Sequence, residues 1–179
     1  SDQEAYKDEK QQQPVDLPAY FISRYPLTNA QFEPFVQSKG YQVQDFWTDP
    51  DWAWRNGANQ DFSDVRNENI RKALESNQSL RPKNRRAEPI FWRRQPWNGP
   101  NRPVVGISWY EAHAYTQWLT YLLQQSPAVL PEGIGEVFTI TLPSEAEWEK
   151  AVRGSEGLIY PWENEWRVDA ANTAETDLN

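Results

Sequence analysis

Three stretches of the sequence combine a helix N-terminal signal with apolar residues at helical spacing. In each signal, a Ser or Thr hydroxyl accepts from the backbone N–H three residues later, where a Glu or Gln side chain reaches back to the first N–H. The apolar residues that follow recur every three or four positions, which predicts amphipathic helices ending near residues 40, 125 and 154. The three pairs are Thr28 with Gln31, Ser108 with Glu111, and Ser144 with Glu147.

Glycine and tryptophan positions refine these helices. Gly40 and Gly154 follow the first and third apolar stripes, and we expect each glycine to end its helix. Trp109, Trp118 and Trp148 lie at helical spacing with other apolar residues. Because aromatic side chains bury much area each, we expect these three tryptophans in the core.

Short runs of β-branched and aromatic residues between the helices predict strands. The runs cover residues 17–22, 103–107 and 138–142, and a Pro stands at or next to the boundary of each. Residues 41–100 show little periodicity, apart from a loosely periodic helix predicted over residues 64–76. Scattered aromatics among Asp, Asn, Pro and Gly predict an irregular surface stretch for the remainder.

Composition sets the size and excludes several kinds of site. The 179 residues suit one domain, which we place at residues 17–179 after a disordered, Gln-rich lead over residues 1–16. There is no Cys and only one His, so these residues offer no disulfide, thiolate metal site, Cys nucleophile or multi-histidine metal site. No apolar run approaches the length of a membrane span and the N-terminus has no apolar signal-peptide core, so we expect a cytoplasmic protein without membrane contact.

The net charge of −8 is unevenly distributed. Residues 81–102 contain seven basic side chains and one acidic one, interleaved with Phe91, Trp92 and Trp97. Such a mixture suits phosphate contact with base stacking, but cation–π packing inside the fold explains the same composition. We favour the packing interpretation, and we favour docking of a protein over nucleic acid as any function of this stretch.

Two further groups of ionisable residues receive structural interpretations. His113 lies beside the apolar stripe of its helix, and the sequence offers it no second His, no Cys and no obvious paired acid. We therefore predict a packing residue rather than a catalytic base. Glu145, Glu147 and Glu149 could suggest acid–base chemistry, but in the first turns of a helix they suit the cap and the helix dipole.

Four segments in order resemble one family. They are residues 21–32 (FISRYPLTNAQF), 102–112 (RPVVGISWYEA), 141–149 (TLPSEAEWE) and 160–162 (YPW). This ordered set resembles the formylglycine-generating-enzyme or sulfatase-modifying-factor domain family. The resemblance implies a C-type-lectin-like α+β fold with two main helices, a small twisted antiparallel sheet and much irregular structure.

The resemblance also implies what these residues lack. The family continues with a Gly-Asn-x-Trp-Glu-Trp segment and an Arg-Gly-Gly-Ser-Trp segment, and catalytic members carry their active cysteines in that half. Neither segment occurs here. We therefore expect a C-terminal segment or a second chain to complete the domain, because missing strands would expose sheet edge and core.

Two functions of different class remain open. One is a non-catalytic binding or display module with a protein ligand, like the variable proteins of diversity-generating retroelements that use scaffolds of this kind. The other is an oxidase-type enzyme, either formylglycine-generating or sulfoxide-synthase-like, whose catalytic residues lie in the absent segment.

A calcium site is predicted near the end of the sequence. Asn172, Glu175 and Asp177 offer side-chain oxygens within six residues, and Ca²⁺ takes oxygen ligands. Family members that bind Ca²⁺ use an Asn and a neighbouring carbonyl near this position, which the Thr173 carbonyl would match. The structural alternative is a polar turn.

Overall fold

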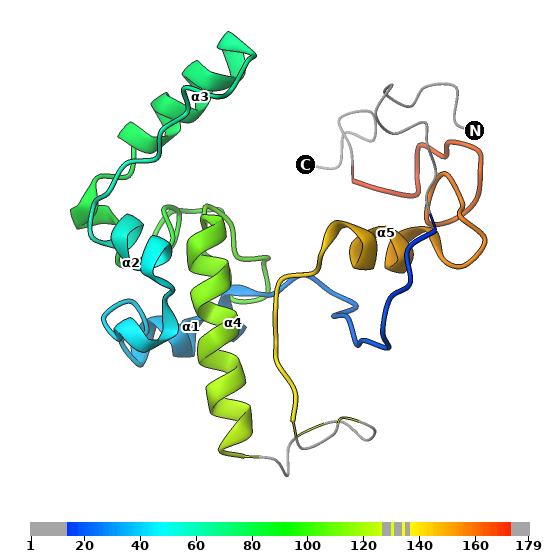
Figure 1. The fold of residues 1–179 in the computed structure, drawn as a ribbon, viewed down its shortest axis with the longest axis horizontal. Coiled ribbons are helices and arrows are strands. Elements are labelled where there is room, and N and C mark those ends of the chain that lie inside the picture. The colour runs from blue at the N-terminus through cyan, green and yellow to red at the C-terminus, as the bar shows by residue number, and fades with distance from the viewer. Residues whose placement is uncertain (1–13, 127–129, 131–133, 135–136, 173–179) are drawn as a thin grey trace. The chain divides into compact units, whose positions relative to one another are not determined.

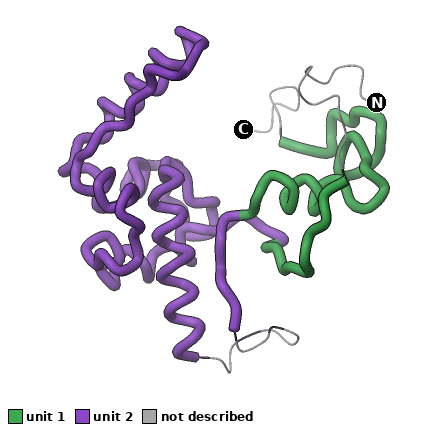
Figure 2. Tube along the Cα trace, viewed as in Figure 1, with its two compact units in different colours: residues 1–23, 143–179 green, residues 24–142 purple. Residues whose placement is uncertain are grey.

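Helices and irregular segments make up the described structure, a computed structural model that describes residues 14–126, 130, 134 and 137–172. Figure 1 shows the helices in chain order. The chain divides into two units (Figure 2). One unit consists of residues 24–142, and the other joins residues 1–23 to residues 143–179.

The unit of residues 24–142 is organised around the longest helix, α4 (Trp109–Gln124). Helix α4 contacts α1 (Asn29–Gln37), α2 (Asp49–Arg55) and a short 3₁₀ helix (Gln44–Phe46). The same unit contains α3 (Glu68–Ser79) and a second 3₁₀ helix (Lys83–Arg85). The helix predicted over residues 64–76 is present as α3. It begins at Glu68, after an Asn67 cap, and ends at Ser79, three residues beyond the predicted end.

All three predicted capping pairs are confirmed. The N–H of Thr28 donates to Gln31 Oε1 at 2.9 Å, and that of Ser108 donates to Glu111 Oε2 at 2.7 Å. Ser144 N–H and Glu147 Oε2, at 2.7 Å, cap α5 (Glu145–Arg153) in the other unit.

Helix α2 has a capping pair that the sequence analysis missed. The N–H of Thr48 donates to Asp51 Oδ2 at 3.3 Å. Asp takes the place of the Glu or Gln that defines the usual pattern. The shorter side chain of Asp51 still reaches the backbone N–H of Thr48. Asp51 also contacts α4, as described below.

The expected α+β fold with an antiparallel sheet is wrong, since the described residues contain five α-helices and no strand, only an isolated bridge between Thr28 and Pro103. A strand needs a parallel or antiparallel neighbour for its backbone groups, and among the described residues the three runs expected as strands have none beyond that single bridge. The N–H of Ile140 donates instead to the Thr120 hydroxyl of α4, at 2.9 Å. The N–H of Val104 donates to the Leu27 carbonyl at 2.9 Å, next to the bridge.

Aromatic side chains from α1 and α4 make the core. Phe32 stacks on Tyr115 with ring centroids 5.0 Å apart, and Phe35 packs against Trp118 at 5.6 Å. Phe32 and Phe35 are fully buried, and burying one such side chain contributes about 1.5–3 kcal/mol. In the part of the chain that the structure describes, all the buried hydrophobic residues belong to residues 24–142: Phe32, Phe35, Tyr41, Trp47, Trp54, Ala114, Tyr115 and Trp118.

Gly40 packs against this core and does not end α1. The helix ends at Gln37, and Lys39, not Gly40, has the positive φ of 62°. A Cβ on Gly40 would lie 2.1 Å from Phe35 Cε2. Glycine is needed there because the Phe35 ring lies against the backbone.

The prediction for the tryptophans is right only for Trp118. Trp109 is 60% exposed and Trp148 is 57% exposed. None of the described residues in the unit of residues 1–23 and 143–179 is fully buried. Within this unit the hydroxyl of Tyr20 donates to the Glu147 carbonyl at 2.8 Å, and Tyr160 stacks on Trp162 with ring centroids 5.4 Å apart.

Helix α3 lies within a polar excursion from the core. None of its residues is buried. Gln60 and Gln78 join the two ends of the excursion: the N–H of Gln60 donates to Gln78 Oε1 at 2.6 Å, and Gln78 Nε2 donates to the Gln60 carbonyl at 3.2 Å. Among the described residues, no helix has the length and apolar character needed to cross a membrane.

Candidate functional site

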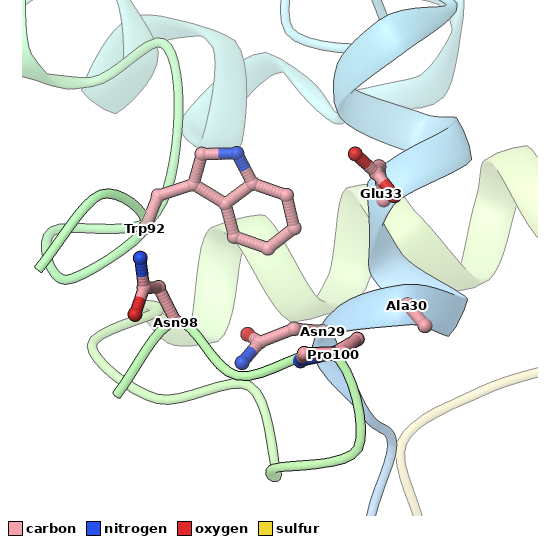
Figure 3. A pocket seen from close by; sticks show the side chains of 6 residues that line it. All are labelled: Asn29, Ala30, Glu33, Trp92, Asn98 and Pro100. Atoms are coloured by element: carbon pink, nitrogen blue, oxygen red, sulfur yellow. The ribbon is translucent and has the colours of Figure 1, made fainter. Parts of the chain in front are cut away.

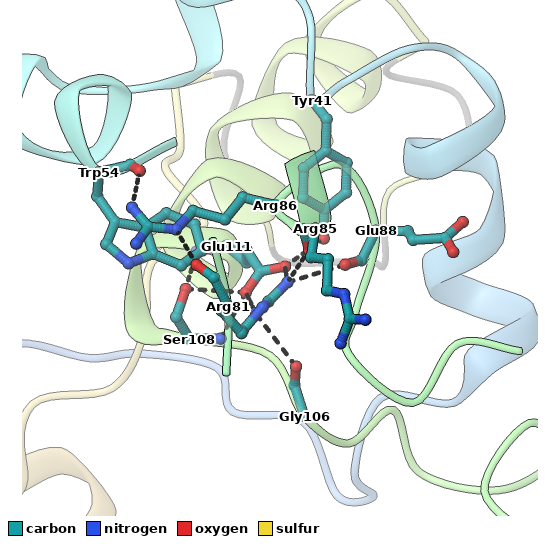
Figure 4. Close-up of polar contacts among 9 residues, drawn as sticks. All are labelled: Tyr41, Trp54, Arg81, Arg85, Arg86, Glu88, Gly106, Ser108 and Glu111. Atoms are coloured by element: carbon teal, nitrogen blue, oxygen red, sulfur yellow. Dashed lines mark hydrogen bonds and ion pairs between the residues drawn. The ribbon is translucent and has the colours of Figure 1, made fainter. Parts of the chain in front are cut away.

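A buried ion pair lies at the N-terminus of α4 (Figure 4). Glu111 is fully buried and accepts from both terminal nitrogens of Arg81. The Tyr41 hydroxyl donates to Glu111 Oε1 at 2.7 Å, and the hydroxyl and N–H of Ser108 donate to Oε2. Both carboxylate oxygens are therefore used by the fold, and Glu111 has no free acceptor for a substrate.

Burial and the neighbouring carboxylate perturb Tyr41. Desolvation, followed by the charge of Glu111, raises the pKa of Tyr41 well above its usual value. Tyr41 thus stays protonated and remains a donor to Glu111.

Arg86 packs beside this pair and supports the packing interpretation of the basic stretch. Its guanidinium lies 4.8 Å from the centroid of the Trp54 ring, and Arg81 lies 5.4 Å from the same ring. Arg86 also donates to the backbone carbonyls of Trp54 and Ala58. Burial, followed by repulsion from Arg81, lowers the pKa of Arg86. For Arg81 and Arg86 the prediction of cation–π packing is confirmed.

The remaining arginines of that stretch with described contacts are exposed. Arg93 forms a surface ion pair with Glu88 at 2.8 Å, and Arg94 lies over the Phe91 ring at 5.8 Å. The docking role predicted for this stretch stays a prediction.

His113 has the paired acid that the sequence analysis did not find. Its Nδ1 lies 2.6 Å from Oδ2 of Asp51, the capping aspartate of α2. The imidazole also stacks on Trp109, with ring centroids 4.9 Å apart. Asp51 and His113 are 62 positions apart, so only the packing of α2 on α4 brings them together.

In the pair of Asp51 and His113, one carboxylate oxygen of Asp51 is unusual. Asp51 is fully buried, and its Oδ1 has no hydrogen-bond partner in the described residues. Gln117 Nε2 lies 3.4 Å from His113 Nε2, which leaves the imidazole between a carboxylate and an amide. The two ring nitrogens of His113 therefore face Asp51 and Gln117.

A hollow of about 200 Å³ opens beside the start of α1 (Figure 3). Figure 3 shows the Glu33 side chain and the Trp92 indole on opposite sides of it, with Asn29 and Pro100 along its lower edge. The six lining residues are Asn29, Ala30, Glu33, Trp92, Asn98 and Pro100. This site could not be predicted from the sequence, because only the fold brings residues 29–33 and 92–100 together.

The predicted calcium site lies mostly outside the described residues. Asn172 is exposed, whereas Thr173, Glu175 and Asp177 are not described, so the site stays a prediction. No group of three or more His, Cys, Asp or Glu side chains suited to a metal occurs in the part of the chain that the structure describes.

The acidic residues of α5 behave as predicted. The bonds from the backbone and hydroxyl of Ser144 lower the pKa of Glu147. Glu149 pairs with Arg153 one turn later. Both carboxylates therefore serve the cap or the helix surface.

Comparison with known families identifies the family of this chain. Residues 1–179 match the family described as the sulfatase-modifying factor enzyme 1-like domain. The chain belongs to this family. The predicted family resemblance is thus confirmed over the whole sequence.

Relatives within and around this family include enzymes and a protein named as inactive. The chain is 29% identical over 95% of its length to a hercynine oxygenase of Mycolicibacterium thermoresistibile, covering 30% of that protein. It is 31% identical over 88% of its length to inactive C-alpha-formylglycine-generating enzyme 2 of Bos taurus, covering 46% of it. With the formylglycine-generating enzyme of Bos taurus it shares 26% identity over 84% of the chain and 35% of that enzyme.

The chain spans less than half the length of each of these relatives. No solved structure matches the chain significantly.

Proposed function

We propose that these 179 residues form a non-catalytic, protein-binding part of a sulfatase-modifying-factor protein. The observation that carries the proposal is the exposure of large aromatic side chains on the surface of the unit of residues 1–23 and 143–179. Trp148 is 57% exposed and Trp166 is 44% exposed. Aromatic residues are enriched where proteins bind each other.

The aromatic side chains of this unit also form a preformed group. Trp166 lies 5.5 Å from Tyr160 and 5.9 Å from Trp162, measured between ring centroids. Trp162 Nε1 donates to the Glu165 carbonyl at 3.0 Å, which fixes the indole. A rigid aromatic surface loses little side-chain entropy on binding, which favours a protein ligand. Such a ligand is either a further segment of the same protein or a second chain.

The ionisable groups of these residues support a non-catalytic role. The sequence has no Cys and a single His, which contacts Asp51 and Trp109. The buried Glu111 uses both carboxylate oxygens within the fold. These residues therefore offer no cysteine nucleophile, and the buried Glu111 is not available as a free acid.

An oxidase-type enzyme is the second candidate, and the names of two relatives favour it. A hercynine oxygenase and a formylglycine-generating enzyme are both similar to this chain. In that case the reacting groups come from sequence outside these 179 residues, and the present residues only support them.

An activity assay on the protein as it occurs in its host separates the two candidates. We expect neither formylglycine formation on a peptide substrate nor oxygen uptake with hercynine, each assayed with added copper or iron. Catalysis of either reaction would overturn the non-catalytic proposal.

Site-specific photo-cross-linking tests the binding surface. A photoreactive residue at position 166 should give a discrete adduct to one polypeptide region, whereas one at exposed position 69 on α3 should not. Trp166→Ala should then weaken binding of that polypeptide, and unchanged affinity would reject this surface.

A further inference from the structure

We infer that the hollow beside α1 is a binding site for a small alkylammonium group. It lies in the unit of residues 24–142 and does not depend on the protein-binding role proposed above. Its volume of about 200 Å³ suits a small group rather than a whole drug-sized molecule.

The hydrogen-bond donors of the first turn of α1 are already used. The N–H of Asn29 donates to the Arg102 carbonyl and that of Ala30 to the Pro100 carbonyl, each at 2.9 Å. The helix N-terminus therefore has no free backbone donor there for an anion.

Asn29 turns its remaining acceptor toward the hollow. Its Nδ2 donates to the carbonyls of Trp97 and Gly99, both at 2.8 Å, so both amide hydrogens are used and the orientation of the amide is fixed. Asn29 is 7% exposed, and because both amide hydrogens are bonded to backbone carbonyls, Oδ1 is the amide atom left to face a ligand. Figure 3 shows this oxygen on the side of the amide nearer to Trp92.

Glu33 supplies a negative charge at the same place. Its carboxylate lines the hollow and makes no ion pair or hydrogen bond within the described residues. By contrast, Arg93 of the neighbouring loop is paired with Glu88, and Arg94 lies over Phe91. The arginines of residues 92–102 do not line the hollow.

Trp92 adds an aromatic wall. The indole is half-buried and held edge to face against Phe32, at 6.1 Å between ring centroids. A ring with this fixed position attracts a cation through its π face. An amide oxygen, a carboxylate and an indole together select a cation with an apolar body.

The test measures ammonium binding by two-dimensional NMR of the tryptophan indole signals in the full chain. Tetramethylammonium and N-acetyl-lysine methylamide are titrated against sodium chloride at equal ionic strength. We expect a saturable shift of the Trp92 signal with a dissociation constant of about 1 mM, and none with sodium. Saturation by tetramethylammonium alone assigns a free ammonium ligand, and saturation by the lysine amide alone assigns a lysine side chain.

Variants make the inference falsifiable. Glu33→Gln should weaken binding about threefold, because it removes the charge of an exposed carboxylate and leaves the Trp92 signal in place as the readout. The matched control is Glu156→Gln, which removes an exposed carboxylate in the other unit and should leave the affinity unchanged. No saturable shift with either ammonium probe, or equal affinity in Glu33→Gln and the parent, would overturn the site.

Discussion

Replacing the buried Glu111 by Gln should strongly destabilise the unit of residues 24–142. Gln has the size of Glu, so the substitution removes a charge and one acceptor without leaving a cavity. Glu111 Oε2 accepts from Ser108 and Arg81, and Oε1 accepts from Tyr41 and Arg81. Whichever way the amide turns, its NH₂ group faces at least two donors.

The magnitude follows from burial. Glu111 is fully buried and Arg81 is 8% exposed, so solvent cannot replace the lost partner. Removing one member of a buried ion pair costs about 3–5 kcal/mol. The free energy of unfolding of a natural domain is about 5–15 kcal/mol, so the loss is a large part of it. For a chain of this size the midpoint of thermal unfolding should fall by roughly 10 °C.

The assay is urea unfolding followed by far-ultraviolet circular dichroism, which reports helix content, because Glu111 lies in the first turn of α4. Glu149→Gln is the matched control, since Glu149 pairs with Arg153 on the surface of α5. That substitution should cost about 0.5 kcal/mol. If Glu111→Gln unfolds within about 1 kcal/mol of the parent, the buried pair does not stabilise the protein and the reasoning fails.

Three further predictions concern pH, a second buried carboxylate and calcium. Burial raises the pKa of Tyr115 to about 12 from 10.0, so the folded state holds this proton more tightly than the unfolded state. The urea midpoint should therefore fall as pH rises from 10 to 12, and it should fall less steeply in Tyr115→Phe. Asp51→Asn should lower the free energy of unfolding by about 1–3 kcal/mol by weakening the contact with His113, and an unchanged urea midpoint in the variant would contradict a stabilising role for that contact. Calcium should raise the thermal midpoint, and chelation or Asp177→Asn should abolish the increase; a calorimetric titration without heat would reject the site.

Local signals in the sequence predicted local structure well. Each capping pair acts across three residues, and all three were confirmed because no distant contact is needed to satisfy them. The expected strands failed for the opposite reason. A run such as residues 138–142 becomes a strand only beside another strand, and here its Ile140 N–H finds a threonine side chain of α4.

The buried polar contacts could not be predicted from the sequence. Arg81 and Glu111 are 30 positions apart, and Asp51 and His113 are 62 apart. The composition of residues 81–102 indicated cation–π packing, but nothing in it separated the buried Arg81 and Arg86 from the exposed Arg93. Exposure of Trp148 was also missed, because helical spacing shows a face and not what covers it.

The glutamine contact that closes the α3 excursion implies where this chain tolerates change in length. Gln60 and Gln78 hold the two ends together, and no residue of α3 is buried between them. The entropy of closing a loop rises by only about 0.6 kcal/mol for each doubling of its length. Insertions, deletions or a foreign domain between these glutamines should therefore leave the aromatic core intact. Related proteins can then diverge in this excursion while α1 still packs on α4.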